Sequence, residues 1–172
     1  YNQRTVYDED FSSGEIFVSD EKYQTMKSFT VLNGDILISS RGTIGKMTIV
    51  PEGSDIGVLH PCLIRLRVDQ KKINKQFLWW YMNHSSLFLQ SVKFESNSTT
   101  IDVIYSNVLN EVKFPVPTLS EQEEIISFLN EKIGVVDETI SIERKRTELL
   151  KEYRQSLISE VVTGKLKVTT DE

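Results

Sequence analysis

Short apolar runs bounded by turn residues fill the first two thirds of the chain, and a long periodic segment fills the last third. Residues 31–40 form a turn followed by a β-branched apolar run, residues 46–50 form a second run that ends at Pro51, and residues 62–68 alternate with period two. Each run is typical of a strand. The three strands predict a small, curved, mainly antiparallel sheet.

Helical spacing replaces the strand pattern after residue 73. Four apolar side chains fall on one broad stripe between residues 73 and 83: Phe77, Leu78, Trp80 and Tyr81. This stripe favours a core position for Trp79, Trp80 and Tyr81 over a platform for stacking nucleic-acid bases. A second helix is expected over residues 85–92. Strands and helices in this order predict an α+β domain.

A proline-rich junction ends this domain. Pro115 and Pro117 donate no backbone hydrogen bond and hold their neighbours extended, so a strand must end here. Ser120 offers an oxygen to cap a helix, and Glu123 three residues later completes a capping box. We therefore place a recognition domain at residues 1–117 and a helical region at residues 118–172.

The helical region has an apolar seam. Gly134 is expected to separate a short helix at residues 121–133 from a long one at residues 135–162, a rod of roughly 42 Å at about 1.5 Å per residue. Steps of three and four residues mark a heptad seam of coiled-coil type. The seam comprises Ile133, Val136, Ile140, Glu143, Thr147, Leu150, Arg154, Leu157 and Val161. The predicted pairing residues are Val136, Ile140, Leu150, Leu157 and Val161.

Polar residues weaken this seam, and apolar neighbours widen it. Glu143, Thr147 and Arg154 interrupt its middle, which argues against a strong autonomous coiled coil. Ile142, Leu149 and Tyr153 broaden the apolar face, so we expect a second contact on the same helix.

Charge does not favour a protein that holds DNA by bulk electrostatics. The net charge is −5, with 20 Lys and Arg against 25 Asp and Glu. Nonspecific DNA affinity comes mainly from phosphate neutralisation by basic side chains. A local patch remains possible, because residues 1–64 carry 5 basic and 9 acidic side chains and residues 65–113 carry 7 and 4.

Cysteine and apolar content narrow the class of protein. Cys62 is the single cysteine, and with two histidines it supplies neither an intramolecular disulfide nor a structural zinc site. No apolar run reaches the roughly 20 residues of a membrane span. We expect a soluble, cytoplasmic protein without a membrane partner. His60 beside Cys62 is an improbable catalytic pair, since no acid lies near to orient the histidine.

The loop at residues 40–46 is the first candidate for DNA contact. A phosphate-binding loop needs four residues before its Gly-Lys pair and a hydroxyl after it, whereas here two intervene and Met47 follows. Glycines would let the backbone approach DNA, and Arg41 would fork onto guanine or grip phosphate. Equally, the glycines fit a plain hairpin that needs positive φ. The candidate residues are Ser40, Arg41, Gly42, Thr43, Gly45 and Lys46.

Two further polar segments are candidates for DNA contact. Residues 94–100 are rich in short side chains that donate and accept hydrogen bonds, which suits phosphates and base edges. An ordinary solvated loop is the alternative interpretation. Three lysines precede the first helix and form a small basic cluster. The candidates are Asn97, Ser98, Thr99 and Thr100 in the polar segment, and Lys71, Lys72 and Lys75 in the cluster.

Several of these segments resemble one protein family. The sequence Pro-Val-Pro-Thr-Leu-Ser-Glu-Gln-Glu-Glu-Ile at 115–125 is followed by Leu-Leu-Lys-Glu-Tyr-Arg-Gln-Ser-Leu-Ile at 149–158 and Val-Thr-Gly-Lys-Leu at 162–166. Upstream lie Gly-Asp-Ile-Leu-Ile-Ser-Ser-Arg-Gly-Thr-Ile-Gly-Lys at 34–46 and Ser-Thr-Thr-Ile-Asp at 98–102. In this order they resemble the specificity subunit of type I restriction-modification enzymes.

The resemblance implies a role and partners. It implies a target recognition domain that reads half of a bipartite double-stranded DNA site, and a helix that pairs antiparallel with a second half-unit or a second copy. The helix would set the spacing between half-sites, with about a dozen base pairs as upper bound at about 3.4 Å per pair. It would also dock the modification (methyltransferase) subunits of a complex that includes restriction subunits. S-adenosylmethionine would bind those partners, and this chain would bind no cofactor. Since the chain begins at Tyr1, a segment upstream is expected.

Two other interpretations compete with this one. The acidic balance favours a coiled-coil scaffold protein that dimerises through its helix and binds another protein without DNA. A stand-alone enzyme is the third. We find no Asn/Asp-Pro-Pro-Tyr tetrapeptide of an adenine methyltransferase and no spaced acidic set of a nuclease, so catalytic residues and metal ligands are predicted to be absent.

Overall fold

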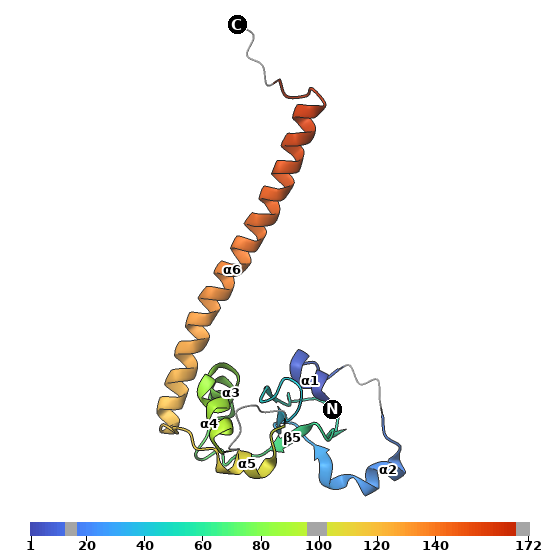
Figure 1. Cartoon of the computed structure of the whole chain (residues 1–172), viewed down its shortest axis with the longest axis vertical. Helices are drawn as coiled ribbons and strands as arrows, with labels where there is room; N and C mark the ends of the chain where they lie inside the picture. Colours follow the sequence, from blue (N-terminus) through green and yellow to red (C-terminus); the bar gives the residue numbers. More distant parts are fainter. Residues whose placement is uncertain (13–16, 96–102, 168–172) are drawn as a thin grey trace. The chain divides into compact units, whose positions relative to one another are not determined.

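The chain divides into two compact units (Figure 1). A computed structural model describes residues 1–12, 17–95 and 103–167. The first unit runs from Tyr1 to Ile126 and holds the sheets and short helices, and the second begins at Ser127 within a long helix. This confirms the predicted α+β class with antiparallel sheets, short helices and a long C-terminal helix. The domain boundary placed after residue 117 stays a prediction.

A three-stranded antiparallel sheet forms the centre of the first unit. Its order is β3 (Met47–Ile49), β2 (Ile36–Ser39) and β5 (Leu63–Leu66). These are the three strands that the apolar runs predict. All four residues of β2 are buried, because the strand lies in the middle of the sheet and both of its faces are covered.

The two faces of β2 supply two cores. Ile36 and Ile38 pack with α3 (Lys75–His84) and α4 (Ser86–Glu95) in a cluster that also contains Met47, Leu78, Met82, Phe88, Val92 and Ile104. Leu37 points to the opposite face, where it packs with Val6, Val31, Val50 and Leu63. Helices α3 and α4 confirm the two helices predicted in this part of the sequence.

Six short elements were not predicted, because two to six residues are too few to show a periodic pattern. They are α1 (Gln3–Asp8), α2 (Asp20–Thr25), the 3₁₀ helix η1 (Lys27–Phe29), β1 (Thr30–Val31), β4 (Gly57–Val58) and α5 (Ser106–Glu111). Strands β1 and β4 pair antiparallel as a second, two-stranded sheet.

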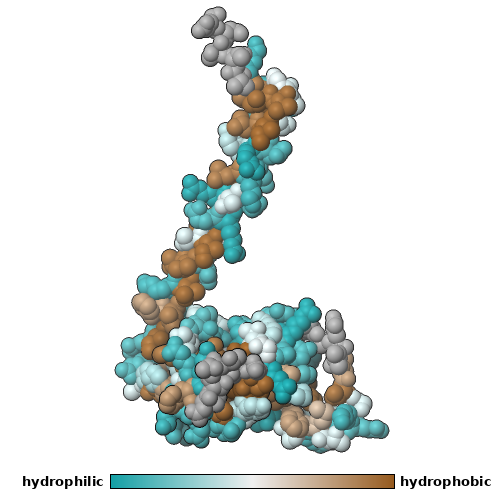
Figure 2. All heavy atoms as spheres, viewed as in Figure 1, coloured by the Kyte–Doolittle hydropathy of each residue, from teal (hydrophilic) through white to brown (hydrophobic). Residues whose placement is uncertain are grey.

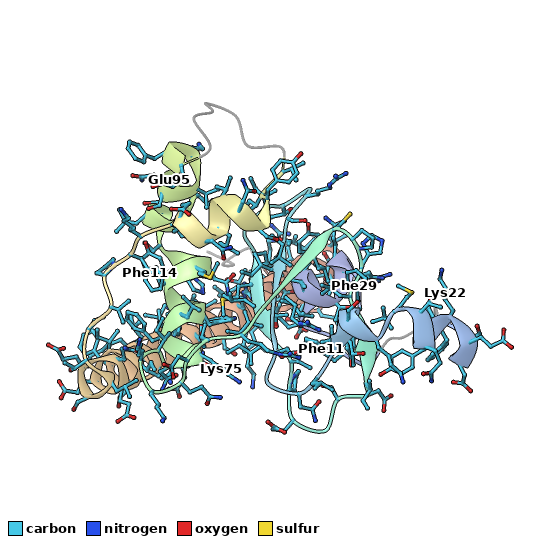
Figure 3. The ribbon with its side chains drawn as sticks, turned by 90° about the horizontal axis from the view of Figure 1, so that it is seen from below. Phe11, Lys22, Phe29, Lys75, Glu95 and Phe114 are labelled. Atoms are coloured by element: carbon cyan, nitrogen blue, oxygen red, sulfur yellow. The ribbon has the colours of Figure 1, made fainter. Side chains whose placement is uncertain are left out.

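Helix α3 joins the sheet through aromatic and polar contacts. Trp79 and Tyr81 pack against the core, as predicted, and Phe114 stacks on Tyr81 with ring centroids 5.1 Å apart. Figure 3 shows Phe114 among these side chains. The side-chain amide of Asn83 accepts a hydrogen bond from the Met47 N–H at 2.9 Å and donates one to the Met47 carbonyl at 2.8 Å. Asn83 therefore fixes α3 to strand β3.

The long helix α6 (Leu119–Val162) begins one residue earlier than the predicted Ser120 cap allows. The side-chain oxygen of Thr118 accepts a hydrogen bond from the Glu121 N–H at 3.4 Å, and the Glu121 carboxylate accepts one from the Thr118 N–H at 2.8 Å. This is a capping box. The prediction of Ser120 and Glu123 was therefore wrong, since Ser120 already lies inside the helix.

The predicted break at Gly134 was also wrong, because α6 is continuous from Leu119 to Val162. A glycine inside a helix costs only about 1 kcal/mol relative to alanine. The residues on both sides keep their helical hydrogen bonds, so this cost does not end the helix. The long rod therefore includes the predicted short helix.

Candidate nucleic-acid interface

The loop at residues 40–46 joins β2 to β3 as a hairpin. Gly42 and Gly45 have φ of +70° and +79°, the left-handed region that side chains rarely adopt. A Cβ on Gly45 would lie 2.8 Å from Leu89 Cδ2 in α4, so the loop also packs closely against that helix. The hairpin interpretation thus accounts for both glycines. It leaves DNA contact by this loop as a prediction.

The loop exposes three of the six candidate residues. Arg41, Gly42 and Thr43 are exposed, Lys46 is half-buried, and Ser40 and Gly45 are buried. The Ser40 N–H donates to the Cys62 carbonyl at 2.9 Å, and its carbonyl accepts from the Ile104 N–H at 2.8 Å. Ser40 therefore belongs to the framework of the loop, and Arg41 is the one exposed cation on it.

Helix α1 holds the exposed loop in place. The Tyr7 hydroxyl donates to the Arg41 carbonyl at 3.2 Å and accepts from the Thr43 N–H at 3.0 Å, and the Gln3 amide also donates to the Arg41 carbonyl. Gln3 and Tyr7 were not predicted as site residues. No sequence signal identifies them, because these contacts join positions more than thirty residues apart without a motif.

The lysine cluster lies at the other end of strand β2. Lys75 donates to the carbonyl of Gly34 at 2.5 Å, and Gly34 precedes the strand, whereas Arg41 follows it. Lys75 is labelled in Figure 3. Lys71 and Lys72 are exposed on the turn before α3. At about 3.3 Å per residue, this end of the sheet is up to roughly 23 Å from Arg41. The structure therefore does not gather the candidates into one patch.

The remaining candidate residues lie outside the part of the chain that the structure describes. Asn97, Ser98, Thr99 and Thr100 belong to residues 96–102. Within the described ranges, no three His, Cys, Asp or Glu side chains come together as metal ligands. His60 Nδ1 accepts a hydrogen bond from the Cys62 N–H at 3.1 Å, a local turn contact. None of the helices in the described ranges has the length and apolar content to cross a membrane.

A buried carboxylate supports the end of the sheet opposite Arg41. Asp35, just before β2, accepts two hydrogen bonds from the Arg67 guanidinium, at 2.6 and 2.9 Å, and one from the Leu32 N–H at 2.9 Å. Burial alone would raise the pKa of Asp35. These hydrogen bonds and the charges of Arg67 and Arg65 outweigh burial and hold the pKa below its ordinary value. Asp35 is therefore a charged framework residue.

The first turn of α6 is anchored in the recognition unit by Gln122, which is fully buried. Its side-chain oxygen accepts from the Asn74 N–H at 2.7 Å, and its NH₂ group donates to the carbonyls of Lys72 and Pro117 at 2.9 and 2.8 Å. The amide thus fills both of its donor positions with backbone partners. Hence the turn carrying Lys71 and Lys72 is fixed to the start of the long helix.

Beyond Ser127, α6 presents its apolar seam to solvent (Figure 2). Of the predicted pairing residues, Val136 is 50% exposed, Ile140 44%, Leu150 58% and Leu157 38%, and Val161 is half-buried. The neighbouring residues Ile142, Leu149 and Tyr153 are more than half exposed as well. Side chains of this kind are normally covered. The seam therefore has no cover within the described part of the chain.

Comparison with known proteins identifies relatives along most of the chain. The model of the type I restriction modification DNA specificity domain matches residues 3–152. Two specificity subunits of Methanocaldococcus jannaschii are similar: the putative type I restriction enzyme MjaX subunit, 25% identical over 91% of this chain, and the MjaVIII subunit, 26% identical over 88%. The Escherichia coli EcoBI specificity subunit is 26% identical over 66% of this chain and 23% of its own length.

The chain spans about a third of the two archaeal relatives, 35% and 36% of their lengths. A solved chain from a study of complex assembly and conformational transition of the type I R-M system has a TM-score of 0.58 and 22% identity. The match covers 76% of this chain and 31% of that one, and at this identity it supports the fold alone. With the domain model matched over residues 3–152, the chain belongs to the type I restriction modification DNA specificity domain family.

Proposed function

We propose that this chain reads one half of a bipartite DNA sequence as the non-catalytic recognition part of a type I restriction-modification complex in the cytoplasm. The observation that supports the proposal most directly is the combination of a family-matched recognition unit with a continuous helix whose apolar seam is exposed. A unit that acted alone would leave this seam in water, so the helix is suited to a partner.

In this proposal the first unit contacts DNA and the helix sets distance. Arg41 is exposed on a loop whose backbone is held by Tyr7 and Gln3, so its side chain is free while its position is fixed. A fork of N–H donors suits guanine or phosphate. The long helix pairs antiparallel with another such helix, holds two recognition units apart and docks the modification subunits. S-adenosylmethionine and the methylation chemistry belong to those subunits.

Methylation mapping tests this proposal. The chain is expressed with the modification subunit of its own system in a host free of DNA methylation, and methylated positions are mapped by single-molecule sequencing. We expect two short half-sites separated by a fixed number of unread base pairs, and no methylation when the chain is omitted. If the complete assembly neither methylates nor binds DNA selectively, the proposal fails and the scaffold interpretation gains support.

A helix deletion tests the spacing role separately. Removal of seven residues between 135 and 160 keeps the heptad phase and shortens the rod by about 10 Å, the length of roughly three base pairs. The spacer should shorten and both half-sites should stay unchanged. Lys145→Ala, an exposed position outside the seam, is the control and should leave the motif unaltered. A changed half-site sequence in the deletion variant would contradict the ruler role.

A further inference from the structure

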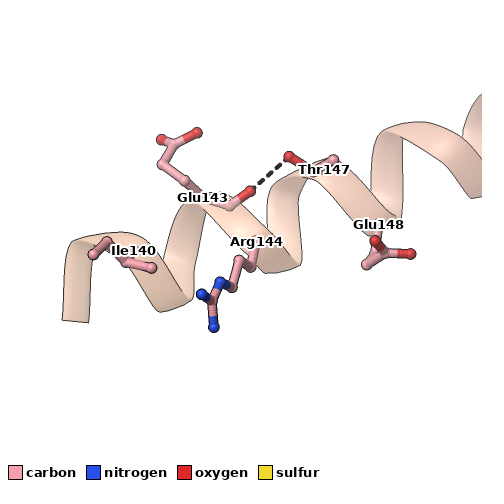
Figure 4. A pocket seen from close by; sticks show the side chains of 5 residues that line it. All are labelled: Ile140, Glu143, Arg144, Thr147 and Glu148. Atoms are coloured by element: carbon pink, nitrogen blue, oxygen red, sulfur yellow. Dashed lines mark hydrogen bonds between the residues drawn. The ribbon is translucent and has the colours of Figure 1, made fainter. Parts of the chain in front are cut away.

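Two shallow hollows follow one another along the exposed face of α6. The first is lined by Ile140, Glu143, Arg144, Thr147 and Glu148, and the second by Thr147, Leu150, Lys151 and Arg154. Figure 4 looks onto the first hollow, with Glu143 and Thr147 on one side and Arg144 and Glu148 on the other. Both contain residues spaced i, i+3, i+4 and i+7. Four residues of a facing helix form such a hole for one inserted side chain in coiled coils.

Two opposite charges lie on the seam itself. Glu143 touches Arg146 of its own helix at 3.5 Å, with both side chains well exposed, and such a pair contributes little. Arg154 has no carboxylate within ion-pair distance in the described part of the chain. When a helix packs over this seam, each charge leaves water and needs an opposite charge across the interface. The seam therefore restricts which register a partner helix takes.

We propose that α6 pairs antiparallel with α6 of a second copy of this chain, in the register that places Glu143 opposite Arg154 of the second copy. The inference deepens the proposed function and rests on it only in treating α6 as a pairing element. The two-fold axis then lies between Glu148 and Leu149, so the Glu-Arg pair occurs twice. Three apolar or small pairs complete the seam: Val136 with Val161, Ile140 with Leu157, and Thr147 with Leu150.

Other arrangements of two copies leave these charges without a partner. A parallel pair in register places Glu143 against Glu143 and Arg154 against Arg154. An antiparallel pair shifted by one heptad places Arg154 opposite Val136 in one direction and opposite Leu150 in the other. The proposed register is the one in which both charges are matched and the seam overlaps along its full length from Val136 to Val161.

The first hollow fits the arriving arginine. In this register Arg154 of the second copy enters the hollow around Glu143, where its lining holds the carboxylates of Glu143 and Glu148 and the guanidinium of Arg144. The lining thus has one excess negative charge, which the arriving cation neutralises. The arginine stem can lie along Ile140 while its head meets the carboxylates. One like-charged edge contact, Arg144 with Lys151 of the second copy, is offset because Lys151 bonds Glu148 at 2.8 Å.

Charge reversal tests the register in the full chain by sedimentation equilibrium over a concentration series. The native chain should form a dimer. Glu143→Arg and Arg154→Glu should each weaken the dimer by about tenfold or more, because each creates two like-charge contacts. The double variant should recover native affinity, and an equimolar mixture of the two single variants should form heterodimers. Glu138→Arg and Lys145→Glu, exposed positions outside the seam, are controls and should dimerise normally.

Disulfide trapping checks the orientation. Cys62, a free half-buried thiol, is replaced by serine, and Val136→Cys and Val161→Cys are introduced into separate chains. The mixture should cross-link under mild oxidation. Chains with Val136→Cys alone should not, since antiparallel copies hold these thiols about 38 Å apart. Self-linking of the Val136→Cys chain, or a double charge variant as weak as the single ones, would overturn the register.

The native chain's own mass separates this inference from the proposed function. A chain that stays monomeric at every concentration and yet directs site-specific methylation would overturn pairing between copies and support the proposed function. A dimer with the predicted charge rescue but no DNA selectivity with its modification subunit would do the reverse.

Discussion

The side chain of Gln122 accepts a hydrogen bond from the backbone N–H of Asn74 at 2.7 Å, and this bond ties the first turn of α6 to the residue that caps α3. Asn74 in turn accepts from the Gln76 N–H at 2.8 Å with its own side chain. The starts of two helices are therefore connected through one buried amide. A rod that begins inside the recognition unit has its origin fixed by that unit's interior.

Replacing Gln122 by leucine should destabilise the recognition unit by about 2–4 kcal/mol, because one backbone N–H and two carbonyls lose their buried partner. Urea unfolding measures this, followed by the fluorescence of Trp79 and Trp80, the two tryptophans of the chain, both in α3. The control Glu123→Leu makes the same replacement at an exposed neighbour and should change stability by less than about 0.5 kcal/mol. Equal effects of both variants would argue against the anchor.

Acid should weaken the recognition unit through Asp35. Its pKa is lower in the folded than in the unfolded chain, so its stabilising contribution is complete above the unfolded value of about 3.9 and is lost as pH falls through the folded value. Asp35→Asn should cost about 1–2 kcal/mol at neutral pH, and the difference from the native chain should shrink below about pH 4. The tryptophan signal measures unfolding at each pH. Glu52→Gln, an exposed carboxylate, is the control, and a constant Asp35→Asn difference down to pH 2 would contradict the prediction.

Gly45→Ala should destabilise more than Gly53→Ala. Both glycines have positive φ, +79° and +84°, so both substitutions carry backbone strain of about 1–2 kcal/mol. A Cβ at position 45 would also lie 2.8 Å from Leu89 and 3.0 Å from Phe88, whereas position 53 has no atom within 4 Å. The clash should add about 1–3 kcal/mol, measured by urea unfolding. Similar effects at the two positions would mean that the hairpin does not pack against α4.

Arg41→Ala should weaken binding of the assembled complex to its mapped site by about 1–3 kcal/mol if this residue reads a base with two hydrogen bonds. Stability should not change, because the side chain is exposed and only the Arg41 carbonyl is held by the fold. Titration of fluorescent duplexes measures the affinity. Arg4→Ala, an exposed arginine paired with Asp8 at 3.2 Å, is the control. Unchanged affinity in Arg41→Ala would leave the loop with a purely structural role.

Long elements were predictable from sequence, and short ones were not. The run through Ile36 and Ile38 is apolar because β2 is buried on both faces, and this signal stands without any neighbour. Strands β1 and β4 have two residues each and exist because they pair with each other, so a local pattern cannot reveal them. The predicted strands and α3 therefore agree with the structure, while α1, α2 and α5 were missed.

The helix start shows how a tertiary contact decides between equal local signals. Thr118 with Glu121 and Ser120 with Glu123 both satisfy the capping-box spacing. The structure uses Thr118, and this start places Gln122 where it bonds Asn74. The same limit applies to the site, since Gln3 and Tyr7 reach Arg41 only after the chain has folded. Sequence identified the exposed loop, but it did not identify the residues that hold it.

Asn83 occupies both backbone hydrogen-bonding groups of Met47, and Met47 lies in β3, the edge strand of the central sheet. Open N–H and C=O groups on an edge strand are the template on which strands of other molecules add, a common start of aggregation. At Met47 this template is already filled by a side chain from α3. Crowded copies of the recognition unit are thereby discouraged from fusing edge to edge at β3, which is useful to a protein whose helix is built to bring copies or partners close together.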